Sequence, residues 1–200
     1  VAAIVRDLQH LVVDLGFRDI AIEDNFFAHS PIRTLELCDA IESLQQVAPF
    51  RWDCQTRVES MRRPDVRAAL ERAGCEAVYL GVEALSPRML EYLGKAADPV
   101  LYLNALKEEV VPPLLESRID CYINLQFAIP GEGKEDWRET LAKLRQLGWM
   151  AEQRGRMITV FPQLAVVYPG TRHFQQALRE GRYAAGSDIF EKFTKWEVGQ

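Results

Sequence analysis

The segment AVYLGVEALSPRMLEYLG, residues 77–94, decides the fold class. It opens with a short apolar run, Ala77–Gly81, that is typical of a buried strand, and Glu83 follows that run almost directly. Ser86-Pro87 supplies a helix N-cap and a first helical residue, so we expect a helix over about Arg88–Leu93. The segment is therefore one strand–helix unit.

The same unit recurs on both sides of this segment. The first of the other strands, at 19–23, is expected to be short and buried, and to end in acidic residues. Alternating strands and helices indicate an α/β domain with a parallel sheet, and we expect one domain over residues 1–200. The other strands are expected at 50–55, 119–127 and 157–166, and the other helices at 1–15, 31–47, 64–73, 99–115 with a break at Pro112-Pro113, 135–154 and 171–180.

The composition is that of a folded globular protein. Hydrophobic residues make up 48% and charged residues 26% of the 200 residues, and the formal net charge is −5. No basic run stands out, so charge gives no indication of nucleic-acid binding. The apolar stretches are far shorter than the ~20 residues that a membrane helix needs. These features indicate neither a nucleic-acid partner nor a membrane.

The cysteines do not have the spacing of a metal site. Cys38 and Cys54, the closest two in sequence, are 16 residues apart, and Cys75 and Cys121 follow at longer intervals. Zinc and iron–sulfur sites place two or three ligands within a few residues of each other. We therefore expect no metal ligand in this chain, and reduced, mostly buried thiols in a cytoplasmic protein.

Charged residues follow the first three predicted strands, where parallel sheets bind ligands. Glu23 and Asp24 could accept hydrogen bonds from an ammonium group, or lie in a solvated loop as helix-capping acids. Arg57 could bind a carboxylate through two of its guanidinium nitrogens, or form a surface ion pair. Glu83 could accept two hydroxyls of a ribose, or only start the next helix. Each position alone is weak evidence for a site.

The last two strands end in polar and glycine-containing segments. Asn124 and Gln126 lie on the fourth strand, and a Pro-Gly turn within Ala128–Gly133 would let the backbone approach a ligand closely. The fifth strand leads to Tyr168–Thr171, a turn whose last residue is positioned to cap the next helix.

Taken in order, these segments resemble the radical S-adenosylmethionine (SAM) superfamily. The resemblance is to the subgroup that includes cobalamin-binding radical enzymes, methylthiotransferases and oxygen-independent coproporphyrinogen oxidases. The matching segments span nearly the whole chain and are Ile22–Phe26, Trp52–Arg57, Ala73–Cys75, Leu80–Ser86, Leu90–Lys95, Ile129–Glu132 and Tyr168–Thr171.

The resemblance implies an incomplete (β/α)6, TIM-like barrel with a parallel sheet. In the family, the first strand leads into a CxxxCxxC loop that ligates a [4Fe–4S] cluster, and reductive cleavage of SAM there yields a 5′-deoxyadenosyl radical that abstracts a substrate hydrogen. This chain contains no CxxxCxxC, and Val1 matches the start of the family's first helix. We therefore expect a core fragment, inactive alone, whose parent protein uses SAM, a [4Fe–4S] cluster and an electron donor such as a reductase or flavodoxin-like protein. Cobalamin is a further cofactor of the subgroup.

The resemblance also implies roles for individual residues. Glu23 and Asp24 match the positions that contact the methionine ammonium of SAM, Glu83 matches the ribose-binding position, and Lys95 matches a basic position that pairs with the methionine carboxylate. The other implied contacts lie on the ribose and adenine side, at Asn124, Gln126, the backbone of Ile129–Gly131 and the Tyr168–Thr171 turn. The family often has Gly at the position of Ala128 and Ser or Thr at that of Gly133.

Two alternatives of other classes stay open. The chain could be a cluster-less relative that serves as a SAM-like binding or scaffold module, or part of an unrelated (β/α)8-barrel enzyme. The sequence does not identify a substrate. If the family's first strand is missing, strand 19–23 forms a sheet edge through which two chains could associate. The central expectation is that Glu23, Glu83, Lys95 and Asn124 meet at one rim of the barrel.

Overall fold

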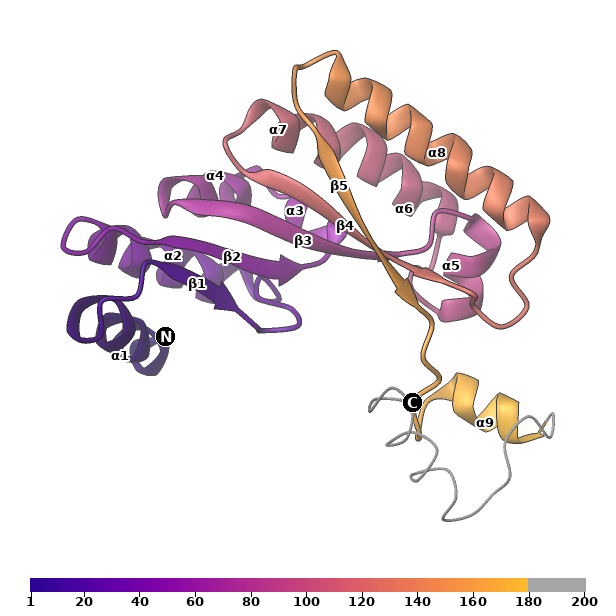
Figure 1. The fold of residues 1–200 in the computed structure, drawn as a ribbon, viewed down its shortest axis with the longest axis horizontal. Helices are drawn as coiled ribbons and strands as arrows, with labels where there is room; N and C mark the ends of the chain where they lie inside the picture. The colour runs from indigo at the N-terminus through magenta and orange to yellow at the C-terminus, as the bar shows by residue number, and fades with distance from the viewer. Residues whose placement is uncertain (180–200) are drawn as a thin grey trace, which may run out of the picture. The chain divides into compact units, whose positions relative to one another are not determined.

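The computed structural model describes residues 1–179, in two compact units that divide between Leu164 and Ala165. The first unit contains a five-stranded sheet (Figure 1). Its strands are β1 (Asp19–Ile22), β2 (Arg51–Thr56), β3 (Cys75–Glu83), β4 (Asp120–Phe127) and β5 (Ile158–Leu164).

The sheet is parallel throughout and keeps the order of the chain, β1-β2-β3-β4-β5. Within residues 1–179, β1 pairs with β2 alone and β5 with β4 alone, so the sheet is open. The predicted α/β class, with an incomplete parallel barrel, is confirmed. All five strands end at the same edge of the sheet, and this edge places the candidate site.

The helices alternate with the strands as predicted, and α2 (Pro31–Gln45), α4 (Pro64–Arg72), α6 (Pro99–Ala105) and α8 (Lys134–Glu152) lie along one face of the sheet in Figure 1. Ser30 caps α2 and Ser86 caps α5 (Pro87–Leu93), each by accepting a hydrogen bond from a backbone N–H, and a proline follows each cap. The helical elements of the first unit are α1 (Ala2–Gln9), η1 (His10–Asp14), α2 (Pro31–Gln45), α3 (Val58–Met61), α4 (Pro64–Arg72), α5 (Pro87–Leu93), α6 (Pro99–Ala105), η2 (Leu106–Val110), α7 (Val111–Glu116) and α8 (Lys134–Glu152).

Three details differ from the sequence-based expectations. The helix expected over 99–115 is broken by the π-helical segment η2, and Pro112-Pro113 lies in the first turn of α7, where a missing N–H costs no hydrogen bond. The helix α3 was not predicted, because four residues are too short for a periodic pattern. The strand β1 is not buried, since Asp19 and Ala21 are exposed on a strand with one neighbour.

The core lies between the sheet and its helices. Side chains alternate along the strands, so that Trp52, Val78 and Ile123 are buried under the helices, while Gln55 and Tyr79 are half-buried on the opposite face. The Trp52 indole donates a hydrogen bond of 2.8 Å to the carbonyl of Ala73, so this tryptophan belongs to the core. We call the opposite face, with its polar and aromatic side chains, the open face. No helix within residues 1–179 is long and apolar enough to cross a bilayer.

The second unit, described up to Arg179, holds the Tyr168–Thr171 turn and α9 (Arg172–Arg179). Thr171 caps α9 as predicted, because its Oγ1 accepts a hydrogen bond of 3.2 Å from the Phe174 N–H. The expected end of this helix, at residue 180, lies outside the described residues. The expected place of the turn beside adenine stays a prediction.

Candidate functional site

Glu83 is the centre of the candidate site. It is the last residue of β3, and the pairing between β3 and β4 shifts by one residue between Gly81 and Glu83, which is a β-bulge. Glu83 also has a φ of 71°, a left-handed conformation that costs free energy for any residue other than glycine. Such strain is retained where it positions a functional side chain.

Two side chains from other segments hold the Glu83 carboxylate. The Lys95 Nζ lies 3.4 Å from Oε1, and the Gln126 Nε2 donates a hydrogen bond of 2.7 Å to Oε2. Gly94 places Lys95, since its left-handed conformation ends α5 and the Lys95 N–H then bonds back to the Leu90 carbonyl at 2.9 Å. Lys95 is only 13% exposed, so the ion pair is partly shielded from water. Three residues singled out from the sequence therefore meet.

Gly81 lies directly beside this group. A Cβ at position 81 would be 3.0 Å from the Glu83 Oε1, so tight that the carboxylate would have to give way, whereas at 3.5 Å the Lys95 Nζ would be in ordinary van der Waals contact. The Tyr102 hydroxyl donates to the Gly81 carbonyl at 3.4 Å, which ties α6 to this end of β3. Asn124 is the register partner of Gly81 on β4. Asn124, also predicted for the site, thus lies beside Gly81 on the neighbouring strand.

An aromatic cluster covers the open face below Asn124. The rings of Tyr79 and Tyr122 stack with centroids 4.7 Å apart, and Phe161 packs against both at 5.5 Å. Phe161 is also the register partner of Asn124 on β5. These rings fill the middle of the open face. The polar side chains that could bind a ligand, Glu83, Lys95 and Gln126, lie nearer the strand ends.

The predicted residues at the ends of β1 and β2 have other partners. Asp24 forms an ion pair of 3.2 Å with Arg33 of α2. Arg57 lies over the ring of Phe26, 4.8 Å from its centroid. Among residues 1–179 neither has a hydrogen bond or ion pair with Glu83, although the charges of Arg57 and Glu83 both act on the pKa of Tyr102.

The charge of Glu23 affects the pKa values of two side chains on the open face. Burial, followed by the charges of Glu23 and Glu76, raises the pKa of Asp53 on the neighbouring strand β2. Burial, with smaller effects of Asp53, Tyr122 and Glu23, also raises the pKa of Tyr79. Glu23 is therefore close enough to act on side chains of β2 and β3, while its convergence with Glu83 stays a prediction.

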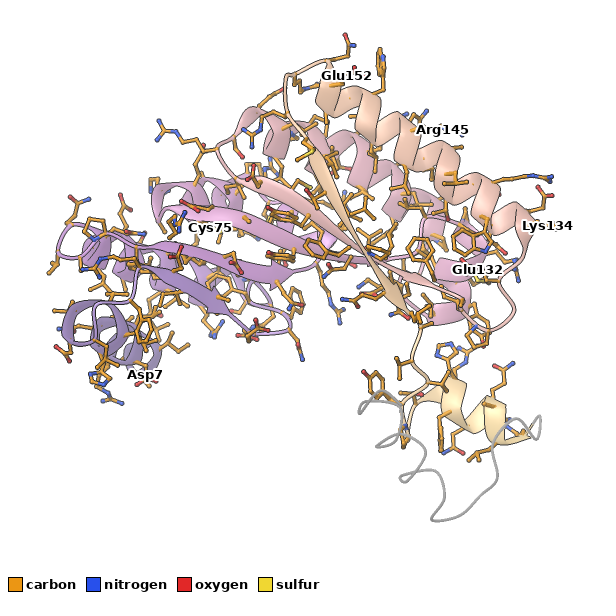
Figure 2. All side chains as sticks on the ribbon, viewed as in Figure 1. Asp7, Cys75, Glu132, Lys134, Arg145 and Glu152 are labelled. Carbon is orange, nitrogen blue, oxygen red and sulfur yellow. The ribbon has the colours of Figure 1, made fainter. Side chains whose placement is uncertain are left out.

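The loop after β4 carries Ile129, whose side chain is 2% exposed. Ala128 before it has a φ of 57°, which explains why glycine suits this position. Figure 2 shows Glu132 in this loop and Lys134 at the first residue of α8. Burial raises the pKa of Glu132, and its Oε2 is buried without a hydrogen-bond partner within residues 1–179. The loop therefore holds two unfavourable features and needs support from elsewhere.

That support comes from residues that the sequence analysis did not single out as site residues. Asp136, in the first turn of α8, accepts hydrogen bonds from Ser86 Oγ at 2.6 Å and from the Gly133 N–H at 2.8 Å, and it forms an ion pair with Arg88. The sequence signal for such a contact is an acid three residues after a Ser or Thr cap. It is missing here because Gly133 occupies the cap position.

The described residues do not fit an iron–sulfur cluster. Cys38, Cys54, Cys75 and Cys121 are all buried, and burial raises the pKa of Cys38 and of Cys121 to about 12. Thiolates ligate metals, and the thiols of Cys38 and Cys121 stay protonated. Figure 2 shows Cys75 at the start of β3, at the end of the sheet away from Glu132. Within residues 1–179, no group of three His, Cys, Asp or Glu side chains could hold a metal ion.

Comparisons with known proteins identify the fold. No family model matches the chain. The uncharacterized methyltransferase PH0819 of Pyrococcus horikoshii is a curated relative that is 25% identical over 178 residues, which are 89% of this chain and 35% of that protein. Among solved structures, the radical SAM methyltransferase TsrM of Kitasatospora setae, with cobalamin and a [4Fe–4S] cluster bound, matches with a TM-score of 0.65 and 18% identity over 83% of this chain and 31% of its own.

Two other structures agree. The cobalamin-dependent SAM radical enzyme OxsB matches with a TM-score of 0.57 and 15% identity, over 90% of this chain and 31% of its own. Elp3 of Methanocaldococcus infernus has the same TM-score with 12% identity, over 90% of this chain and 45% of its own. The chain has a radical SAM fold and spans about a third of the length of PH0819, TsrM and OxsB.

Proposed function

We propose that this chain is the SAM-binding part of a radical SAM enzyme core. The observation that carries the proposal is the contact of Glu83 with Lys95 and Gln126 at the strand ends of a radical SAM fold. SAM, when bound beside a reduced [4Fe–4S] cluster, is the source of a 5′-deoxyadenosyl radical that abstracts hydrogen from a substrate. Because the described residues do not fit the cluster, the proposal for this chain concerns SAM alone.

The charges of the site suit the parts of SAM. The Glu83 carboxylate can accept hydrogen bonds from both ribose hydroxyls, and Gln126 orients it by donating to Oε2. Lys95 offers a cation for the methionine carboxylate, and its contact with Glu83 at 3.4 Å is long enough to be shared with a ligand. Asn124 adds an amide beside Gly81 for the ribose or adenine side.

The other predicted site residues are proposed to contact other parts of SAM. Glu23 is the stronger candidate for the methionine ammonium, since Asp24 is already paired with Arg33. Arg57, whose guanidinium lies over the Phe26 ring, is proposed to bind a carboxylate of the ligand. The backbone at Ile129 is proposed to flank adenine. The cytoplasmic location, an electron donor of the reductase or flavodoxin type, and association through the β1 edge are further parts of this proposal.

A second candidate function is methyl transfer with SAM as the methyl source. It is favoured by the curated relative, whose name describes a methyltransferase, and by TsrM, whose structure is that of a radical SAM methyltransferase with bound cobalamin. The two candidates share the SAM site and differ in product, since radical cleavage releases 5′-deoxyadenosine and methyl transfer releases S-adenosylhomocysteine. A scaffold module would bind SAM without releasing either, and an unrelated (β/α)8 enzyme would not bind SAM.

The test uses the full-length protein that contains this chain, purified without oxygen and reconstituted with iron and sulfide. SAM binding is measured by calorimetry, and products are identified by mass spectrometry. We expect Glu83→Gln to weaken SAM binding about 10-fold or more, because the ribose loses charge-assisted hydrogen bonds. Glu109→Gln, which removes an exposed ion pair with Arg62, is the matched control and should not change SAM affinity. Equal SAM affinity in the wild type and Glu83→Gln would remove Glu83 from the site.

A further inference from the structure

Asp136 is a buried carboxylate with an unusual number of partners. It is 4% exposed, and its two oxygens accept four hydrogen bonds. Ser86 Oγ and the Arg88 Nε donate to Oδ1 at 2.6 and 3.1 Å, while the Arg88 Nη2 and the Gly133 N–H donate to Oδ2. These bonds, with that of Arg88 as the largest cause, lower the pKa of Asp136 to about 2. The carboxylate is therefore ionised under all ordinary conditions.

The partners of Asp136 belong to two segments that are distant in sequence. Ser86 and Arg88 lie at the start of α5, and Gly133 lies at the end of the loop after β4. The same Arg88 Nη2 also donates to the Gly131 carbonyl at 2.8 Å. Arg88 thus reaches both the loop and the carboxylate that caps α8. We call Ser86, Arg88 and Asp136 the clamp.

We infer that the clamp positions the loop 128–133 against the segment that carries Glu83 and Lys95. This inference rests on the proposed SAM site and adds positioning residues to it. Ser86 lies three residues after Glu83, and Lys95 follows the end of α5, so the clamped helix joins the two charged residues of the site. The loop carries Ile129, proposed for the adenine side. The clamp therefore sets the distance between the ribose and adenine ends of the site.

The loop requires such a support for physical reasons. Ala128 is in a left-handed conformation, and the buried Glu132 Oε2 lacks a partner within residues 1–179. Both features cost free energy and persist where surrounding contacts over-determine the backbone. The forked guanidinium of Arg88 can bond Asp136 through two nitrogens and the loop carbonyl at the same time. A lysine would keep the charge and lose this geometry.

Arg88→Lys is the test variant, because the Arg88 side chain is 58% exposed and its replacement should not prevent folding. In the ligand-free protein, we expect amide exchange at Glu132 and Gly133 to become about 10-fold faster. In binding measurements, we expect about 10-fold weaker affinity for SAM and for 5′-methylthioadenosine alike, because both carry the adenosine that the loop faces. The double variant Asp136→Asn with Arg88→Lys should lose little more affinity for the two nucleosides than either single variant does, since the two residues act through one contact.

Arg63→Lys is the matched control. Arg63 makes the same two-nitrogen contact with Asp65, at 3.1 and 2.6 Å, on the exposed start of α4. Loss of this contact should change neither amide exchange in the loop 128–133 nor the affinity for either nucleoside. Unchanged exchange in the loop of Arg88→Lys, or an affinity loss matched by Arg63→Lys, would overturn the inference. A wild-type protein that binds neither nucleoside would instead remove the proposed function, and the affinity part of this inference with it.

Discussion

The side chain of Gln126 donates a hydrogen bond of 2.7 Å to the Glu83 carboxylate, although the two residues are 43 positions apart in the sequence. They come from the ends of neighbouring parallel strands, β4 and β3, which the fold brings to one edge. With Lys95 on the other oxygen, the carboxylate is held from two sides before any ligand binds. Such preorganisation reduces the entropy lost when a ligand is bound.

Replacing Gly81 tests how closely this group is packed. In Gly81→Ala the new Cβ would be 3.0 Å from the Glu83 Oε1, so the carboxylate would have to shift by a few tenths of an ångström, which perturbs its contacts with Lys95 and Gln126. We expect SAM affinity of the full-length protein to fall about 10-fold, while the free energy of unfolding changes by about 1 kcal/mol at most. Calorimetry and urea unfolding measure the two effects.

Gly148→Ala on α8 is the control for that experiment, because a Cβ there meets no atom within 4 Å. It should stabilise the helix by roughly 0.5–1 kcal/mol and leave SAM affinity unchanged. If Gly81→Ala binds SAM as well as Gly148→Ala does, the packing around Glu83 does not shape the site.

Lys95→Met tests the cation of the site. We expect this variant to lose about 10-fold in affinity for SAM and less for 5′-methylthioadenosine, because only SAM carries the methionine carboxylate. Competition binding with the two nucleosides separates the effects. Lys143→Met removes an ion pair with Glu139 on α8 and should leave both affinities unchanged. An equal loss for both nucleosides would place Lys95 elsewhere than at the carboxylate.

The left-handed backbone at Glu83 predicts a conflict between stability and binding. Glycine adopts a φ of 71° without strain, whereas alanine does not. Glu83→Gly should therefore be more stable than Glu83→Ala by about 1–2 kcal/mol, while both lose the proposed ribose contact. Urea unfolding gives the difference in stability. If the two variants are equally stable, the backbone strain at this position is not a cost that the wild type bears.

Acid titration tests the clamp through Asp136. Its pKa is lowered from 3.8 to about 2 in the folded protein, so the unfolded chain takes up the proton first as the pH falls. The stability that this carboxylate contributes is fully present above about pH 4 and is lost as the pH falls toward about 2. The difference in unfolding free energy between wild type and Asp136→Asn should shrink over that window. A constant difference would mean that the Asp136 pKa is the same in both states.

Much of the fold was predictable because it depends on local signals. The apolar run before Glu83 and the Ser-Pro pairs at 30–31 and 86–87 mark strands and helix starts that the structure confirms. The bulge at Glu83 was not predictable, since it arises from pairing with β4, a contact between distant segments. The π-helical segment η2 likewise depends on packing around the break before Pro112.

The candidate site was predictable in part for the same reason. Glu83, Lys95 and Gln126 were expected together, and the structure brings them into contact. Asp24 and Arg57 have the expected residue types, but their partners Arg33 and Phe26 come from α2 and the loop before it, which no strand-end pattern reveals. The clamp was missed because its contacts join Asp136 to residues about 50 positions earlier.

The most direct test of the central claim is a structure of the full-length protein with a SAM analogue bound. The account predicts that the ribose hydroxyls lie within hydrogen-bond distance of the Glu83 carboxylate and that the methionine carboxylate lies beside the Lys95 ammonium. An analogue bound elsewhere, with Glu83 still paired to Lys95 and Gln126 alone, would contradict it.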